Sequence, residues 1–319
     1  MWRGGLTEAR VGSIVFSNMF IDAMGRAVLE TLAYSDVFEY PLHLDELHRY
    51  LPIRAEVAQM PQALNALTEL VGKQDDFYFL SGREKIVEIR KRRESHSHKL
   101  IGLALRYGRM LGFLPFIRMV ALTGSLAVMN SSQKSDFDYM LVTAPNRVWT
   151  ARAFALLFNR ITRLLSHTLC PNIIVSENML AWSTHDLYSA RELCQMIPIT
   201  GMDQYQRLLK ANEWAKDFLP NCGDDFSREQ SATEVVTTFQ SLLEFPLRGK
   251  LGNRFEKWEM DRKIERFSKQ AGFGDETVFN AEVCQGNFHH HHKWTREIFE
   301  EKISVLETEI QVSSETIAT

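Results

Sequence analysis

The sequence has little cysteine and no strong excess of charge of either sign. Its 319 residues include four cysteines, Cys170, Cys194, Cys222 and Cys284, and no two of them form a Cys-x-x-Cys pair. This spacing indicates neither a zinc site nor a redox pair, so we expect a protein of the reducing cytoplasm. The formal net charge of −3 excludes a whole-molecule field that draws the chain to nucleic acid or to anionic lipid.

Long apolar runs are also missing. The first 25 residues contain only a short apolar stretch, which is broken by charged residues, so we expect no secretory signal. The most apolar later stretch, 100–122, is interrupted by three arginines, which predicts no membrane span and no membrane partner. With 45% hydrophobic and 24% charged residues, the composition is that of a folded globular protein and excludes a disordered or collagen-like chain.

The first part of the chain, residues 26–93, has the pattern of a winged-helix module. Apolar residues recur at helical spacing in three segments, and two short apolar runs then flank a Ser-Gly turn, which predicts a β-hairpin. The expected helices are at 26–37, 44–47 and 61–72, and the expected strands are at 77–80 and 86–89. Three helices followed by a hairpin is the order of elements in a winged helix.

Residues 100–182 alternate between helical and extended patterns, which predicts an α/β core. The expected elements are a helix at 100–112, strands at 119–122 and 137–143, a helix at 147–167 and a strand at 173–176. From 183 to 312 the pattern is almost entirely helical. We therefore expect an α+β protein, in which a small mixed β-sheet core lies between an N-terminal winged-helix module and a largely helical C-terminal region.

The segment between the first two core strands carries the residues of chemical interest. Gly124 and Ser125 follow an apolar strand and open a short helix, where backbone N–H groups and the helix dipole can bind phosphate oxygens. After ten further residues, Asp136 and Asp138 flank Phe137, and strand alternation places both carboxylates on one face. Neighbouring carboxylates repel each other unless a cation such as Mg²⁺ neutralises them. We therefore expect phosphate binding at Gly124 and Ser125, and metal binding and catalysis at Asp136 and Asp138.

Gly-Ser after a strand, a ten-residue gap and then Asp-x-Asp in an apolar strand resembles the signature of the DNA polymerase β-like nucleotidyltransferase superfamily. The whole chain is similar to bacterial nucleotidyltransferase-domain proteins with an N-terminal winged helix. The resemblance implies that Gly124 and Ser125 bind the tail of a nucleoside triphosphate and that Asp136 and Asp138 hold Mg²⁺. It also implies transfer of a nucleoside monophosphate to the hydroxyl of an unknown acceptor, with release of pyrophosphate.

The resemblance further implies a third carboxylate on a later strand, and the sequence departs from the family pattern there. Asn172 stands near the expected position, and an amide oxygen is a weaker metal ligand that cannot accept a proton. Glu177 falls on the opposite face of the strand by parity, and Asp186 begins the next helix. The third ligand is therefore unassigned at this point.

Lysine and arginine are concentrated in residues 81–120, which contain ten of them against three glutamates. Such a segment is either a solvated helix surface or a phosphate-facing patch for a nucleic acid or a nucleotide. The second interpretation, together with the missing third carboxylate, leaves an alternative function open. It is a catalytically weak or inactive regulatory protein that binds nucleotide or nucleic acid on a transferase core.

Overall fold

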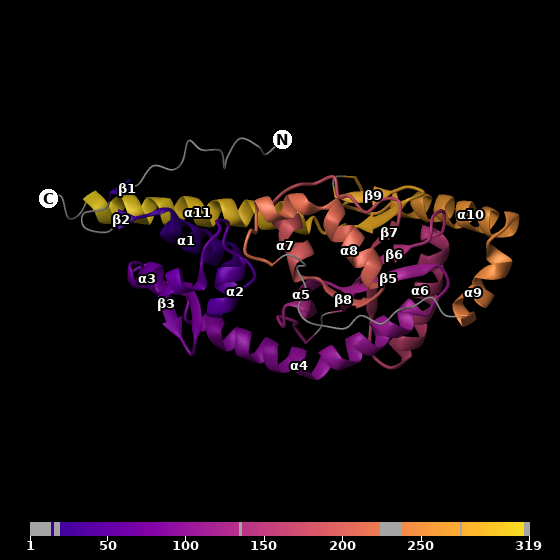
Figure 1. Cartoon of the computed structure of the whole chain (residues 1–319), viewed down its shortest axis with the longest axis horizontal. Helices are drawn as coiled ribbons and strands as arrows, with labels where there is room; N and C mark the ends of the chain where they lie inside the picture. The colour runs from indigo at the N-terminus through magenta and orange to yellow at the C-terminus, as the bar shows by residue number, and fades with distance from the viewer. Residues whose placement is uncertain (1–13, 16–19, 134–135, 224–237, 275, 316–319) are drawn as a thin grey trace.

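A six-stranded mixed β-sheet forms the centre of the protein (Figure 1). The computed structural model describes residues 14–15, 20–133, 136–223, 238–274 and 276–315. In spatial order the strands are β8 (Ile197–Thr200), β5 (Ile117–Leu122), β6 (Phe137–Thr143), β7 (Leu169–Ser176), β10 (Val283–Gly286) and β9 (Thr277–Phe279). β6 and β7 run parallel, and the other neighbouring pairs in this sheet are antiparallel. The expected α+β class with a mixed sheet is confirmed.

Both faces of the sheet are buried, because alternate residues of its central strands point to opposite sides. One face carries Met119, Ala121, Met140, Val142 and Val175, and the other carries Val120, Leu122, Tyr139, Leu141 and Ile174. Helices against the first face include α7 (Leu187–Gln195) and α8 (Met202–Ala211), and those against the second include α4 (Lys85–Gly112), α6 (Val148–Leu164) and α10 (Lys250–Phe267). Burial on two sides explains why β5 and β6 are nearly continuous apolar runs.

Three helices and a β-hairpin form the N-terminal part of the structure. The helical elements are α1 (Ala23–Asp36), α2 (Leu44–Arg49), η1 (Val57–Gln59) and α3 (Met60–Asn65), and the short strands β1 (Ile14–Val15) and β2 (Phe20–Ile21) precede them. The hairpin consists of β3 (Val71–Gln74) and β4 (Phe77–Leu80). Its turn residues, Asp75 and Asp76, both have positive φ angles, as the commonest two-residue hairpin turn requires.

The prediction of a hairpin strand at 86–89 was wrong. These residues belong to the start of α4, where Ile86 and Val87 are buried and Glu88 is exposed. A short apolar run fits a strand and a buried helix equally well, so the pattern alone misassigned it. The predicted helix at 61–72 was also too long, because its last residues already form the first strand of the hairpin.

Two long helices connect the N-terminal part with the sheet. α4 runs along one edge of the molecule, and α11 (His291–Glu315) runs along the opposite edge (Figure 1). α4 begins beside the hairpin turn and packs on β5 further along, whereas α11 packs on both α1 and α7. The expected boundary between residues 93 and 100 therefore falls inside one continuous helix. The division into 26–93, 100–182 and 183–312 stays a prediction.

The expectation of an almost entirely helical region after residue 183 was wrong. β8, β9 and β10 belong to this region and complete the two ends of the sheet. They have only three or four residues each, and β8 contains Pro198, which an edge strand tolerates because one side of its backbone needs no partner. The remaining helical elements are η2 (Glu213–Asp217), α9 (Thr238–Glu244) and η3 (Phe245–Leu247). Among the described helices, none combines the length and apolar composition that a membrane span needs.

A disulfide bond joins Cys194 of α7 to Cys222, which follows η2. The sequence analysis did not predict this bond. It considered only cysteines that are close in sequence, whereas these two are 28 residues apart and meet only in the folded chain. Cys170 and Cys284 are free thiols. Since disulfides are uncommon in reducing compartments, the cytoplasmic location stays a prediction.

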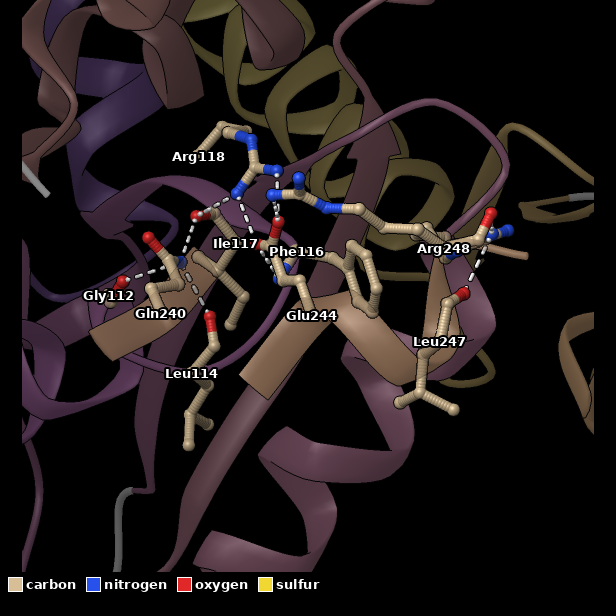
Figure 2. A network of polar contacts seen from close by, with 10 residues as sticks. Gly112, Leu114, Phe116, Ile117, Arg118, Gln240, Glu244, Leu247 and Arg248 are labelled. Atoms are coloured by element: carbon tan, nitrogen blue, oxygen red, sulfur yellow. Dashed lines mark hydrogen bonds and ion pairs between the residues drawn. The ribbon is translucent and has the colours of Figure 1, made fainter. Parts of the chain in front are cut away.

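A buried polar network ties α9 to the connection between α4 and β5 (Figure 2). The side-chain nitrogen of Gln240 donates hydrogen bonds to the carbonyl oxygens of Gly112, Leu114 and Ile117, at 3.3, 2.8 and 2.9 Å. These carbonyls lie at the end of α4 and the start of β5, where the helix no longer supplies partners. Gln240 therefore fixes the angle at which α4 enters the sheet.

Glu244, on the same helix, holds the first residues of β5. Its carboxylate is 2% exposed and accepts the Phe116 N–H at 2.8 Å and two Arg118 N–H groups at 2.8 and 3.1 Å (Figure 2). Arg248 donates to the same carboxylate at 3.0 Å. Although burial opposes the charge, these hydrogen bonds lower the pKa of Glu244. The carboxylate is therefore fully paired in the folded state.

We predict that Glu244→Gln lowers the free energy of unfolding by about 2 kcal/mol at neutral pH, because a buried charged acceptor of two arginines is lost. The expected loss is no larger because both arginines are partly solvated. Because the pKa of Glu244 is lowered in the folded state, its contribution to stability is present at pH values above the ordinary glutamate pKa of 4.5. This contribution is lost as the pH falls below that value. Urea unfolding across this range measures both effects. Glu265→Gln, which removes an exposed ion pair with Lys269, should leave stability unchanged; equal losses in the two variants would contradict the account.

Candidate functional site

The turn after β5 lies directly against Asp138 of β6. Gly124 begins α5 (Gly124–Ala127) with a φ of 66°, in the left-handed region that glycine tolerates. A Cβ on Gly124 would stand 2.4 Å from Oδ2 of Asp138, so only a residue without a side chain fits. The Thr123 N–H also donates to the Asp138 carbonyl oxygen at 2.9 Å. Gly124 and Asp138 are therefore in contact, as the sequence interpretation required.

Asp136 and Ser125 flank this contact. Asp136 is exposed and directly precedes β6, Asp138 is half-buried within it, and Phe137 between them is buried in the opposite direction. Ser125 is half-buried in α5, and its carbonyl oxygen accepts the Asn130 N–H at 2.8 Å. Residues 134 and 135 of the ten-residue gap lie outside the described residues. The two aspartates and the Gly-Ser turn thus belong to one end of the β5–β6 pair.

The aspartate pair carries negative charge that nearby side chains do not balance. The pKa of Asp138 is raised to about 7, mainly by burial and also by the charge of Asp136, against a lowering by its hydrogen bond with Cys170. The pKa of Asp136 is raised by burial, while a hydrogen bond with Thr168 and the charge of Arg163 oppose this. Neither aspartate forms a salt bridge with another described residue. The pair therefore favours a proton or a cation.

A third carboxylate, Glu192 of α7, interacts electrostatically with Asp138. Its pKa is raised to about 7 by burial and by the charge of Asp138. α7 packs beside α5, which brings this helix to the same end of the sheet as Gly124. The sequence interpretation missed Glu192, because it sought an acid on the strand after α6 and this one is on a helix. No motif in the sequence marks Glu192, which follows Arg191 and precedes Leu193.

The two acidic candidates for a third ligand form their contacts elsewhere. Glu177 interacts with Gln204 and Arg207, and Asp186 caps α7 and forms an ion pair with His292. Asn172 lies in β7 at an irregularity of its register with β6. Its side-chain oxygen is buried and accepts no hydrogen bond from the described residues.

The turn at Gly124 offers hydrogen-bond donors rather than a helix dipole. α5 has only four residues, so the expected dipole contribution was wrong, since a single turn sums too few aligned peptides. The first N–H groups of the turn have no partner within so short a helix. Thr123, which is 2% exposed, adds a buried hydroxyl that forms no hydrogen bond with the described residues. These groups are suited to an anion.

The loop after α5 is held by the N-terminal part of the chain. The Tyr40 hydroxyl lies 2.8 Å from the Val128 carbonyl oxygen, and the Asn130 side chain donates to the Phe38 carbonyl oxygen at 3.2 Å. Arg93 of α4 also donates to the Phe38 carbonyl oxygen, at 2.9 Å. The Gly-Ser turn is therefore clamped between the sheet on one side and residues 38–40 on the other.

No family model, curated protein or solved structure matches the chain. Within the described residues, no group of three or more His, Cys, Asp or Glu side chains is arranged to hold a metal ion.

We predict that Asp138→Asn stabilises the metal-free protein above about pH 7 and leaves stability unchanged below the ordinary aspartate pKa of 3.8. The raised pKa means that the folded state resists ionisation, so wild-type stability falls as the pH rises between these values. Urea midpoints with a chelator present measure the difference. Asp203→Asn, an exposed acid on α8, is the control and should follow the wild-type profile. Parallel profiles for Asp138→Asn and wild type would refute the assignment.

Proposed function

We propose that the protein is a Mg²⁺-dependent nucleotidyltransferase that moves a nucleoside monophosphate from a nucleoside triphosphate to an acceptor hydroxyl. The observation that carries the proposal is the contact of Gly124 with Asp138, which places a donor-lined turn beside two unbalanced carboxylates. In this proposal residues 100–182 are the nucleotidyltransferase core and residues 26–93 are a winged-helix module. The helix order and the β3–β4 hairpin support the second assignment.

The aspartate pair has the donor set that Mg²⁺ prefers. Mg²⁺ is commonly bound by one or two carboxylates together with substrate phosphates, so Asp136 and Asp138 suffice on the protein side. Burial of Asp138 and its repulsion by Asp136 together raise the pKa of Asp138, and a dication would relieve this cost of ionisation. When bound there, the metal would neutralise charge on the phosphates of the substrate.

The chain's own residues then position the substrate and move one proton. Backbone N–H groups at Gly124 and Ser125 and the Thr123 hydroxyl bind phosphate oxygens. The acceptor oxygen attacks the α-phosphorus, the bond from this phosphorus to the oxygen shared with the β-phosphate breaks, and pyrophosphate leaves with that electron pair. Glu192 accepts the hydroxyl proton, for which a pKa near 7 is well suited.

We predict that the wild type transfers label from α-labelled but not from γ-labelled nucleoside triphosphates to a component of a desalted cell extract. The double variant Asp136→Asn/Asp138→Asn should lose roughly 100-fold or more of this activity, since the charge stabilisation at the phosphates is removed. Scintillation counting of separated products measures the transfer. Asp203→Asn serves again as the matched control. Equal labelling by wild type and double variant would remove the site, and transfer of the γ-label would indicate another reaction.

The second candidate function is a regulatory protein that binds nucleotide or nucleic acid without transferring it. The amide at Asn172 and the lack of a three-ligand cluster among the described residues favour it. Binding of a triphosphate with no transfer of either label would support this function over the first.

A further inference from the structure

The structure divides the ten basic side chains of residues 81–120 into two groups. Five of them form ion pairs with acidic residues of other elements: Arg83 with Asp36, Arg90 with Glu46, Lys91 with Asp75, Arg93 with Glu39 and Arg118 with Glu244. Arg90 is 2% exposed, so it belongs to the interior. The basic run at 90–93 is therefore largely structural and is not a free phosphate-binding patch.

The other five, Lys85, Arg92, Lys99, Arg106 and Arg109, are exposed and lie on α4. None of them forms an ion pair with a residue that the structure describes. Lys85, Arg92, Lys99 and Arg106 follow one another at intervals of seven residues, so they form a cationic stripe along the helix that drifts by about 20° per interval. At 1.5 Å per residue this cationic stripe is ~32 Å long, the length of about nine base pairs.

The space between these cations is occupied by small residues. Ser95 and Gly102 are exposed beside the stripe, and a Cβ on Gly102 would meet no atom within 4 Å. An exposed glycine inside a helix costs stability relative to alanine without a packing reason. The absence of a side chain at Gly102 leaves the helix backbone open to close approach by a ligand. Glu88 is an exposed acid near the stripe, and Lys91 pairs with it at 3.2 Å.

The composition of the stripe favours a nucleic acid over a lipid surface. Along α4, all of which is described, one large apolar side chain is exposed, that of Met110 in the last turn. A helix that binds a bilayer needs an apolar face to insert, whereas a phosphate backbone needs only cations and access. A second copy of the chain is also a poor occupant, because a symmetric contact would place arginines against arginines.

The end of the stripe lies against the strand that carries the two site aspartates. Tyr107, between Arg106 and Arg109, contacts the rings of Phe137 and His167 with centroids at 6.2 and 5.8 Å. Phe137 separates the two site aspartates, and His167 directly precedes Thr168, which is hydrogen-bonded to Asp136. α4 therefore packs on the strand that carries the aspartates, against the face opposite to their carboxylates.

We propose that the exposed cations of α4 bind the phosphate backbone of a nucleic acid strand. Binding itself does not depend on transfer, so the two proposals can fail separately.

The test is fluorescence anisotropy with labelled single-stranded and duplex RNA and DNA, at several salt concentrations, on the full chain. We expect the triple variant Arg92→Gln/Lys99→Gln/Arg106→Gln to reduce the slope of log affinity against log salt by about two to three, and to weaken binding at least tenfold. The variant Arg254→Gln/Lys257→Gln/Arg266→Gln, with the same charge change on α10, should bind as wild type does. Circular dichroism checks that each variant is folded.

Several results would overturn the proposal: no binding of any of the four probes by wild type, equal losses in both triple variants, or a preference for phosphatidylglycerol vesicles over all oligonucleotides. Comparison of the four probes identifies the preferred strand type. Asp136→Asn/Asp138→Asn should retain binding. This variant therefore separates failure of the binding surface from failure of the catalytic proposal.

Discussion

The contact between a residue without a side chain and a half-buried carboxylate is the constraint on which the candidate site depends. Gly124 allows Asp138 to lie against the turn after β5, and any Cβ there would displace the carboxylate. Burial and the charge of Asp136 then raise the pKa of Asp138, so the site is poised to receive positive charge. The donors of the turn and this uncompensated pair face the same small region, which suits a metal-bound polyphosphate.

The rest of the fold holds this contact in place. Glu244 and Gln240 hold the entry to β5 (Figure 2). The sheet fixes the register of β5 and β6, and residues 38–40 clamp the loop after α5. α4 runs from the N-terminal part to the sheet and carries both the exposed cations and Arg93, which contacts the clamp at Phe38 (Figure 1).

Local sequence patterns predicted the elements that carry the site. The features that were not predicted depend on contacts between segments far apart in the sequence. The strand at 137–143 and the Gly-Ser turn have strong local signals, a continuous apolar run and a glycine at a strand end, and both were found where expected. Glu192, the Cys194–Cys222 bond and the strands β8 to β10 depend on which distant segments meet, and no local pattern encodes that. The prediction of a strand at 86–89 failed for another reason, because a run of four mostly apolar residues fits a strand and a helix equally well.

Calorimetric titration with Mg²⁺ and a non-hydrolysable nucleoside triphosphate tests the central claim most directly, when wild type is compared with Gly124→Ala and Gly102→Ala. The added methyl group meets the Asp138 carboxylate in the first variant and open space in the second. The account predicts that Gly102→Ala binds as wild type does and that Gly124→Ala loses binding while it remains folded. Equal binding by Gly124→Ala and wild type would contradict it.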